Sequence, residues 1–263
     1  MHTSATDERR RPPPQLVVDG LTAGYGGATV VDDVSFTVGP GEVVALLGPN
    51  GAGKSTVLKA MVGQARITAG SVLLGGIDIT SVRPHLLAGM GCGYVPQYRD
   101  VFDELTVREN LEMGGYLLGK EAIAKRIDDA MEVFPALAGM MDRPARKLSG
   151  GEHKMLAIAR VMMSQPTLMA LDEPTANLAP ILGRRLLDEQ IRAVVRSGAA
   201  VLLVEQRAAA ALSVADWVYL LVAGRVVRSG HPAELRAQAD FAEVFLGGGD
   251  ATTAARNTSD VRA

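Results

Sequence analysis

Short apolar runs rich in β-branched residues, bounded by glycine and proline, occupy the N-terminal part of the chain. They cover 16–18, 29–31 and 34–38, and a second group covers 71–74 and 77–79. Such runs are typical of short strands that are joined by tight turns. The pattern therefore predicts an antiparallel β layer, in which the second group forms a further hairpin.

The apolar period in the middle of the chain is that of helices. Apolar residues recur every three or four positions from Leu105 to about Pro166. Thr106 stands three residues before Glu109, which is the arrangement of a capping box at a helix start. Further predicted helices cover 121–134 and 152–163. We therefore expect a helical segment inserted between two parts of a sheet.

Strands and helices alternate after this segment. The predicted strands are 168–171 and 200–204, the predicted helices are 181–196 and 208–214, and a hairpin joins 217–222 to 225–228. The apolar run 43–47 and a helix from Lys54 to about Val62 form an earlier unit of this kind. Such alternation predicts a parallel sheet with helices on its faces. The expected fold class is α/β, with a mostly parallel sheet, an N-terminal antiparallel β layer and an inserted helical subdomain.

Composition narrows the class of protein. Apolar residues make up 48% of the 263 residues, yet no apolar run approaches the ~18 residues that cross a bilayer. A net charge of −2 provides no drive towards nucleic acid, so no nucleic-acid partner is expected. The single cysteine, Cys92, excludes an internal disulfide and suits a reducing compartment. We expect a soluble, cytoplasmic protein.

The two ends of the chain differ in composition from its middle. Residues 1–14 combine polar residues, a run of arginines and three prolines, so they are predicted to be a flexible tail and not a secretory signal. Residues 249–263 are mostly small and polar and are predicted to be disordered. Between them, 15–248 is expected to form one domain that contains the helical subdomain at about 98–165.

A glycine-rich segment follows the apolar run 43–47 and precedes a predicted helix. It fits the phosphate-binding pattern G-x-x-x-x-G-K-[ST] and consists of Gly48, Pro49, Asn50, Gly51, Ala52, Gly53, Lys54, Ser55 and Thr56. Backbone N–H groups of such a loop and of the following helix bind phosphates, Lys54 adds a positive charge, and the Ser55 hydroxyl is suited to Mg²⁺. The alternative is a glycine-rich turn with no ligand, and the loop alone does not separate ATPases from GTPases or kinases.

A second apolar run, 168–171, ends in two carboxylates, Asp172 and Glu173. The first would orient a metal ion and the second would serve as a base for water, which are the groups that the glycine loop lacks. Solvated loop carboxylates are the alternative, but the apolar run before them argues against it. The two segments together predict that the chain binds and hydrolyses a nucleoside triphosphate.

Five motifs in a fixed order make the chain resemble the ATP-binding subunits of ABC transporters over about 16–246. They are an aromatic at Tyr25, the loop 48–56, Val-Pro-Gln at 95–97, Leu-Ser-Gly-Gly-Glu at 148–152 and the run 168–173. The resemblance implies a P-loop ATPase core with ATP and Mg²⁺ as cofactors. It also implies a dimer, in which the Leu-Ser-Gly-Gly segment of one subunit completes the nucleotide site of the other.

The resemblance also implies roles for single residues. Tyr25 would stack on adenine, with an ordinary edge-strand tyrosine as the alternative, and Gln97 would reach the metal or the attacking water. Asp172 would orient the metal shell together with Ser55, and Glu173 would be the general base. The residues that would contact the γ-phosphate in the opposite subunit are Ser149, Gly150 and Gly151.

The chain departs from the family pattern at three places. Many members carry a histidine after the strand 201–204, where this chain has Gln206, which can donate to a γ-phosphate but cannot become charged. Ala179 stands where an aspartate is common, so contacts across the dimer through this position stay open. His153 and Lys154 replace the more usual glutamines after Leu-Ser-Gly-Gly-Glu, and we expect both to be exposed on a helix.

Three short segments indicate a branch of the family. Val204-Glu205-Gln206, Leu178-Ala179-Pro180 and the run 91–97 resemble the shorter ATPase subunit of branched-chain amino acid importers. This resemblance implies membrane permeases, a second ATP-binding subunit and, indirectly, a solute-binding protein as partners at the inner face of the cell membrane. An importer of urea or another small solute, a soluble non-transport ABC ATPase and a non-catalytic nucleotide-binding scaffold stay open as alternatives.

Overall fold

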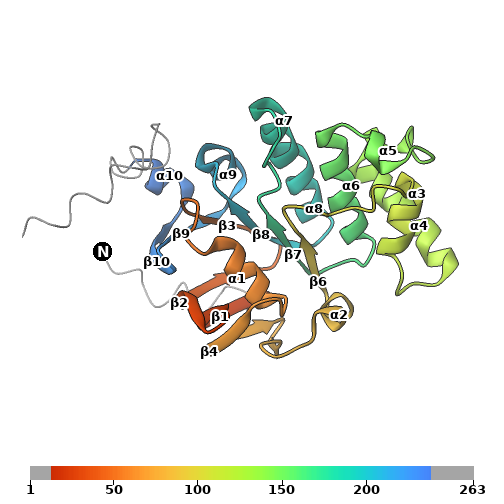
Figure 1. The fold of residues 1–263 in the computed structure, drawn as a ribbon. Coiled ribbons are helices and arrows are strands. Elements are labelled where there is room, and N and C mark those ends of the chain that lie inside the picture. The colour runs from red at the N-terminus through yellow and green to blue at the C-terminus, as the bar shows by residue number, and fades with distance from the viewer. Residues whose placement is uncertain (1–12, 238–263) are drawn as a thin grey trace, which may run out of the picture.

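The computed structural model describes residues 13–237, which form two β-sheets and the helices packed around them (Figure 1). The predicted α/β class, with an antiparallel layer and a mostly parallel sheet, is confirmed. The expected disordered segment 249–263 and nearly all of the expected tail 1–14 lie outside the described residues. The limits of the domain and of its helical subdomain therefore stay predictions.

The antiparallel sheet contains four strands in the order β2-β1-β4-β5. They are β1 (Leu16–Tyr25), β2 (Ala28–Val38), β4 (Arg66–Leu74) and β5 (Ile77–Asp78). The runs predicted as two strands at 29–31 and 34–38 are one continuous strand, β2. Between them Asp33 has a φ of +56°, and the pairing with β1 shifts there. This bulge interrupts the alternation of side chains, which explains why the sequence pattern divides into two.

The second sheet contains six strands in the order β10-β9-β3-β8-β7-β6. They are β3 (Val43–Leu47), β6 (Cys92–Val95), β7 (Leu168–Asp172), β8 (Ala200–Glu205), β9 (Trp217–Val222) and β10 (Arg225–Gly230). All neighbours are parallel except β9 and β10, which form the predicted hairpin. Because the parallel strands share one direction, the carboxyl ends of β3, β7 and β8 meet at one edge of the sheet.

The helices occupy both faces of this sheet and one end of the molecule (Figure 1). They are α1 (Lys54–Met61), α2 (Pro84–Leu87), α3 (Val107–Gly114), α4 (Lys120–Val133), α5 (Pro135–Ala138), α6 (Gly150–Met162), α7 (Pro180–Arg185), α8 (Arg192–Arg196), α9 (Ala208–Val214) and α10 (Pro232–Arg236). Short 3₁₀ helices cover Ala88–Met90 and Ala145–Lys147. The helix predicted over 181–196 contains a π-helical segment, Leu186–Ile191, between α7 and α8. Across residues 13–237, no helix combines the length and the hydropathy needed to span a membrane.

The predicted capping box at the start of α3 is confirmed. Thr106 Oγ1 accepts a 3.2 Å hydrogen bond from the Glu109 N–H, and Glu109 Oε2 accepts a 2.7 Å bond from the Thr106 N–H. Each bond satisfies a backbone donor that the first helical turn leaves without a partner. Helices α3 to α6 lie together beyond β6 and β7 (Figure 1), and α3 and α6 contact each other directly.

The central strands are buried on both faces. Val43, Ala45 and Leu47 of β3 belong to an apolar cluster with the helices α3 to α6, α8 and α9 and the π-helical segment, while Val44 and Leu46 belong to a cluster with α1 and the antiparallel sheet. Because successive side chains of a strand point to opposite faces, a strand between two such layers must be apolar throughout. The uninterrupted apolar runs therefore place β3, β7 and β8 in the middle of the fold.

Candidate nucleotide site

The glycine loop occupies the turn between the end of β3 at Leu47 and the start of α1 at Lys54. Gly51 and Gly53 have φ values of +78° and +101°, which side chains other than glycine rarely adopt. A Cβ atom on Gly48 would lie 2.2 Å from the Leu221 carbonyl oxygen, so this position also excludes a larger residue. The glycines of the pattern are thus explained by the path of the backbone.

Lys54 is the first residue of α1, and its side chain is buried. Its Nζ donates hydrogen bonds of 2.9 Å to the Gly48 carbonyl and 3.1 Å to the Pro49 carbonyl. The same Nζ lies 3.6 Å from Glu173 Oε1. The ammonium therefore lies between the loop and the carboxylate that follows β7.

Ser55 and Asp172 meet at the same edge of the sheet. Ser55 Oγ donates a 2.9 Å hydrogen bond to Asp172 Oδ1. Asp172 is the last residue of β7 and is buried. Burial raises the pKa of Asp172 above its ordinary value, and the hydrogen bond from Ser55 opposes that rise.

Glu173 follows Asp172 in a strained conformation. Its φ is +46°, which is uncommon for a residue with a side chain and occurs often at functional sites. Its backbone N–H donates to the Val204 carbonyl at 2.9 Å. Its Oε2 accepts a 2.8 Å hydrogen bond from Gln97 Nε2, so the loop after β6 also reaches this carboxylate.

An open cavity of about 650 Å³ connects these groups. Its lining residues come from β2, from the start of α1 and from the segments at the ends of β3, β6, β7 and β8. They are Val30, Asn50, Gly51, Ala52, Gly53, Lys54, Ser55, Thr56, Gln97, Tyr98, Glu173, Ala176, Asn177, Glu205, Gln206 and Arg207. Its volume lies within the ~300–1,000 Å³ that small-molecule sites occupy. The structure thus brings the glycine loop, Gln97, Glu173 and Gln206 to one cavity.

Glu205 is a member of this group that the sequence analysis did not single out. It is buried at the end of β8, and its Oε1 accepts bonds of 3.0 Å from the Thr175 N–H and 2.7 Å from Thr175 Oγ1. Burial raises the pKa of Glu205, and the bonds from Thr175 oppose the rise. Arg207 Nη1 donates to the Leu178 carbonyl at 2.9 Å. The sequence signal that could have identified Glu205 is a charged residue at the end of an otherwise apolar strand.

Three groups of predicted residues lie outside the cavity lining. The first, Gly48, Pro49 and Asp172, contacts the lining residues Lys54 and Ser55 through hydrogen bonds, and the other two are Tyr25 and the start of α6. Tyr25 is 44% exposed at the tip of the hairpin between β1 and β2, and Val30 of the same hairpin lines the cavity. Ser149 and Gly150 are exposed at the start of α6, where Ser149 Oγ accepts from the Glu152 N–H at 3.4 Å. Their roles, and that of Gly151, stay predictions, since a single chain does not bring them to its own site.

The expectation that His153 and Lys154 are exposed was wrong. Lys154 is buried and forms an ion pair with Asp100, and His153 is partly buried beside Asp100 and Asp103. Helix α6 packs against the segment that follows β6, and acidic side chains of that segment face these two residues. The spacing of apolar residues along a single helix cannot predict this contact, because the partner segment is distant in sequence.

Comparisons with known proteins agree with this geometry. The family model described as ABC transporter matches residues 31–176. A probable branched-chain amino acid transport ATP-binding protein, LivF, from Archaeoglobus fulgidus is 40% identical over 227 residues, which are 86% of this chain and 96% of that protein. The high-affinity branched-chain amino acid transport ATP-binding protein BraG from Pseudomonas aeruginosa is 39% identical over 235 residues, 89% of this chain and 100% of that protein.

A solved structure has the same fold. It is the ADP conformation of MJ1267, an ATP-binding cassette of an ABC transporter, with a TM-score of 0.80 and 26% identity. The match covers 90% of this chain and 100% of that chain. The likeness therefore includes both sheets and the helices around them.

Proposed function

The chain belongs to the ABC transporter family as an ATP-binding subunit that hydrolyses ATP, and we propose that it powers an importer of branched-chain amino acids. The observation that supports this substrate class is the identity of 40% and 39% to two branched-chain amino acid transport ATP-binding proteins over most of their lengths. Membrane permeases are the partners of such subunits, which work in pairs. We place the pair at the inner face of the cell membrane.

We propose that the glycine loop and Lys54 hold the phosphates of ATP. The loop and the first turn of α1 offer backbone N–H groups at the positive end of a helix. Lys54 Nζ now donates to two uncharged carbonyl oxygens. Phosphate oxygens are charged and therefore stronger acceptors, so they would compete well for the same ammonium.

Glu173 is our candidate for the general base. It lies at the cavity with 14% of its side chain exposed, and Gln97 and Lys54 both contact its carboxylate. A carboxylate in that position can accept the proton of a water molecule as its oxygen attacks the γ-phosphorus. Gln206 lines the cavity from the next strand end and can donate to the γ-phosphate.

Mg²⁺ fits the donor set of this site. Ser55 and Asp172 supply a hydroxyl and a carboxylate that already contact each other, and Gln97 supplies an amide oxygen. Within residues 13–237, no group of three or more His, Cys, Asp and Glu side chains could hold a metal ion. An ion at Ser55 and Asp172 would therefore depend on phosphate oxygens for its remaining ligands, and it would offset their negative charge.

We further propose that the start of α6 acts on the nucleotide of a partner subunit. Ser149 and Gly150 are exposed and do not line the cavity of their own chain. The Gly150 N–H lies at a helix start, where an anion binds well, while the Ser149 N–H donates to Glu152 Oε2 at 2.8 Å. In a head-to-tail pair, each cavity would be closed by the Ser149 segment of the other subunit, and the exposed Tyr25 would contact the adenine.

Reconstitution tests the substrate class. The chain would be purified with its neighbouring permeases, placed in liposomes and supplied with the cognate solute-binding protein loaded with leucine, isoleucine or valine. We expect several-fold stimulation of ATP hydrolysis together with uptake of the labelled amino acid. Urea-loaded binding protein is the control. Stimulation and uptake with urea alone would contradict the branched-chain assignment and leave the ATPase assignment intact.

A further inference from the structure

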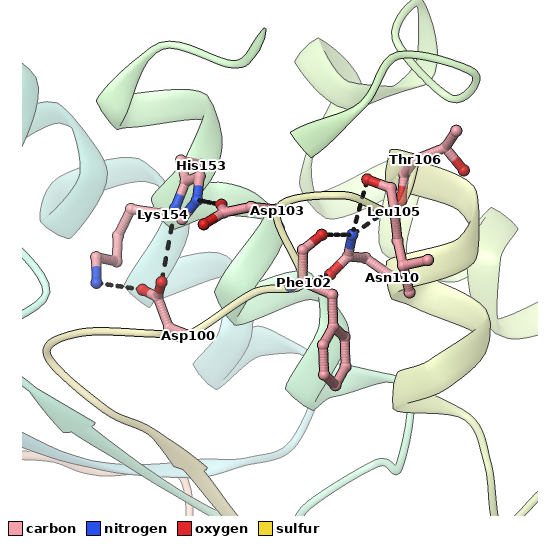
Figure 2. Close-up of polar contacts among 8 residues, drawn as sticks. All are labelled: Asp100, Phe102, Asp103, Leu105, Thr106, Asn110, His153 and Lys154. Carbon is pink, nitrogen blue, oxygen red and sulfur yellow. Dashed lines mark hydrogen bonds and ion pairs between the residues drawn. The ribbon is translucent and has the colours of Figure 1, made fainter. Parts of the chain in front are cut away.

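A buried ion pair joins helix α6 to the segment between β6 and α3 (Figure 2). Lys154 of α6 is 7% exposed and Asp100 is 3% exposed. Lys154 Nζ donates to Asp100 Oδ2 and, at 3.3 Å, to the backbone carbonyl of Gln97. A charged ammonium is stable inside a protein only where an opposite charge and hydrogen bonds replace its water. The ion pair and the Gln97 carbonyl supply both.

His153 adds a second connection beside the first. Its Nε2 lies 3.0 Å from Asp103 Oδ1 and its Nδ1 lies 3.5 Å from Asp100 Oδ1 (Figure 2). Asp100 is therefore contacted by two consecutive residues of α6, one through each carboxylate oxygen. The segment that follows Gln97 is thus held against α6 through its acidic side chains.

Asn110 of α3 holds the far end of the same segment (Figure 2). Its side chain is fully buried, and its Oδ1 accepts a 2.8 Å hydrogen bond from the Phe102 N–H. Its Nδ2 donates to the carbonyls of Phe102, Leu105 and Thr106 at distances of 3.0, 3.3 and 2.9 Å. Within the described residues, Lys154 is the side chain with a hydrogen bond to the Gln97 backbone.

The contact to Gln97 leads directly to the candidate base. The Gln97 backbone oxygen accepts the hydrogen bond from Lys154 Nζ. The Gln97 side-chain amide donates a second hydrogen bond, of 2.8 Å, to Glu173 Oε2. Two hydrogen bonds therefore connect α6 to Glu173 through one residue. Ser149, which is proposed to reach the partner's nucleotide, is the N-cap of the same helix.

We propose that Lys154 is a positioning residue for ATP hydrolysis, because it holds the Gln97 backbone from α6 and so fixes the Gln97 side chain against Glu173. The proposal rests on the ATPase function and not on the transported substrate. Lys154 does not line the cavity. Its action is to link the helix that Ser149 caps with the amide that contacts the base, so that closure of the α6 tip on a partner's nucleotide is transmitted to Glu173.

Three variants separate this positioning role from the stability of the ion pair. Lys154→Met removes the ammonium and leaves Asp100 buried without its cation. The double variant Asp100→Leu with Lys154→Met removes both charges, so no buried ion is left unpaired. The double variant Asp100→Asn with Lys154→Gln replaces the pair by neutral amides and keeps an N–H donor for the Gln97 carbonyl. Lys125→Met, at an exposed lysine of α4, is the control.

The measurements are kcat and KM for Mg²⁺-ATP of the full-length chain, its nucleotide-binding stoichiometry and its thermal unfolding. For Asp100→Leu with Lys154→Met we expect a melting temperature near that of the wild type, an unchanged KM and about a tenfold loss of kcat per bound nucleotide. Asp100→Asn with Lys154→Gln should recover most of that kcat. Lys154→Met should lose both kcat and thermal stability.

Several results would overturn the proposal. Full kcat in Asp100→Leu with Lys154→Met would show that Lys154 serves only to pair Asp100. If this double variant failed to fold and bind nucleotide, the role of the pair Lys154 and Asp100 would be to stabilise the fold. A neutral amide pair that folds but recovers no activity would also count against positioning through the Gln97 carbonyl. A wild-type chain without ATP hydrolysis would instead contradict the ATPase function itself, which distinguishes the two failures.

Discussion

Ser55 Oγ donates a 2.9 Å hydrogen bond to Asp172 Oδ1 and joins the first turn of α1 to the end of β7 across 117 positions of the chain. The contact is possible because β3 and β7 lie on either side of β8 in a parallel arrangement, with their carboxyl ends at one edge. It pairs a hydroxyl with a buried carboxylate, two oxygen ligands suited to Mg²⁺.

Ser55→Ala should raise the Mg²⁺ concentration needed for half-maximal ATP hydrolysis by about tenfold, because one oxygen ligand and the group that orients Asp172 are both lost. Activity at saturating Mg²⁺ should recover in part. The measurement is a Mg²⁺ titration at fixed ATP. Ser197→Ala, at the end of α8, is the control. An unchanged Mg²⁺ requirement would show that Ser55 is not a ligand.

Glu173→Gln should lower kcat by about 10²–10⁴-fold and leave ATP affinity within about threefold, because the amide keeps the shape of the side chain but cannot accept a proton. Binding without hydrolysis should also trap the closed pair in ATP, which size-exclusion chromatography would detect. The exposed Glu121→Gln is the matched control. Normal turnover in Glu173→Gln would place the base elsewhere and would favour a non-catalytic role for this carboxylate.

Lys54→Ala should weaken ATP binding itself by about tenfold or more, since a charge-assisted contact to phosphate is lost. Isothermal titration with a slowly hydrolysed analogue measures this affinity directly. Lys120→Ala removes the same charge from an exposed position of α4 and should have no effect. If Lys54→Ala bound the analogue as tightly as the wild type, the phosphates would have to lie away from α1.

Gln206→Ala should slow turnover by about tenfold while nucleotide binding stays within about threefold, because a neutral donor to the γ-phosphate is lost and no charge changes. Single-turnover hydrolysis separates this effect from product release. Gln64→Ala, exposed after the end of α1, is the control. A wild-type rate would mean that the residue after β8 has no part in the reaction.

The sequence predicted the parts of the site that depend on short segments. The glycine loop and the pair Asp172 and Glu173 follow apolar strands directly, so pattern and flanking elements were enough to bring them to one sheet edge. The capping box of Thr106 was predictable for the same reason, because both of its partners lie within one helical turn.

The contacts that the sequence did not predict connect distant segments. Lys154 is buried because α6 meets Asp100, which lies 54 positions earlier. Glu205 is satisfied by Thr175, 30 positions away, and the π-helical segment Leu186–Ile191 differs from an α-helix by backbone pairing that no local pattern marks. Burial of a charge is decided by the partner that packing supplies, so the period of one element gives no information on it.

The buried carboxylate of Glu205 should make stability depend on pH. Its folded pKa is raised by burial above the ordinary value of 4.5, so the folded state keeps its proton where the unfolded state has lost it. The native state is therefore favoured by this group below the unfolded pKa, and that contribution is lost as the pH rises through the folded pKa. In Glu205→Gln the amide oxygen still accepts from Thr175. The free energy of unfolding of this variant, relative to the wild type, should therefore increase as the pH rises through the folded pKa of Glu205 and stay constant above it.

Urea unfolding of the wild type and of Glu205→Gln, at a series of pH values from 4.5 upwards, measures the difference in their free energies of unfolding. The titration of other groups cancels in this difference. Glu205→Ala is the contrasting variant, because it leaves the buried Thr175 N–H and hydroxyl without their acceptor. It should be less stable than the wild type by about 1–3 kcal/mol at the low end of the pH series, and this deficit should shrink as the pH rises through the folded pKa of Glu205. A difference between Glu205→Gln and the wild type that did not change with pH would show that Glu205 titrates alike in the folded and unfolded chains.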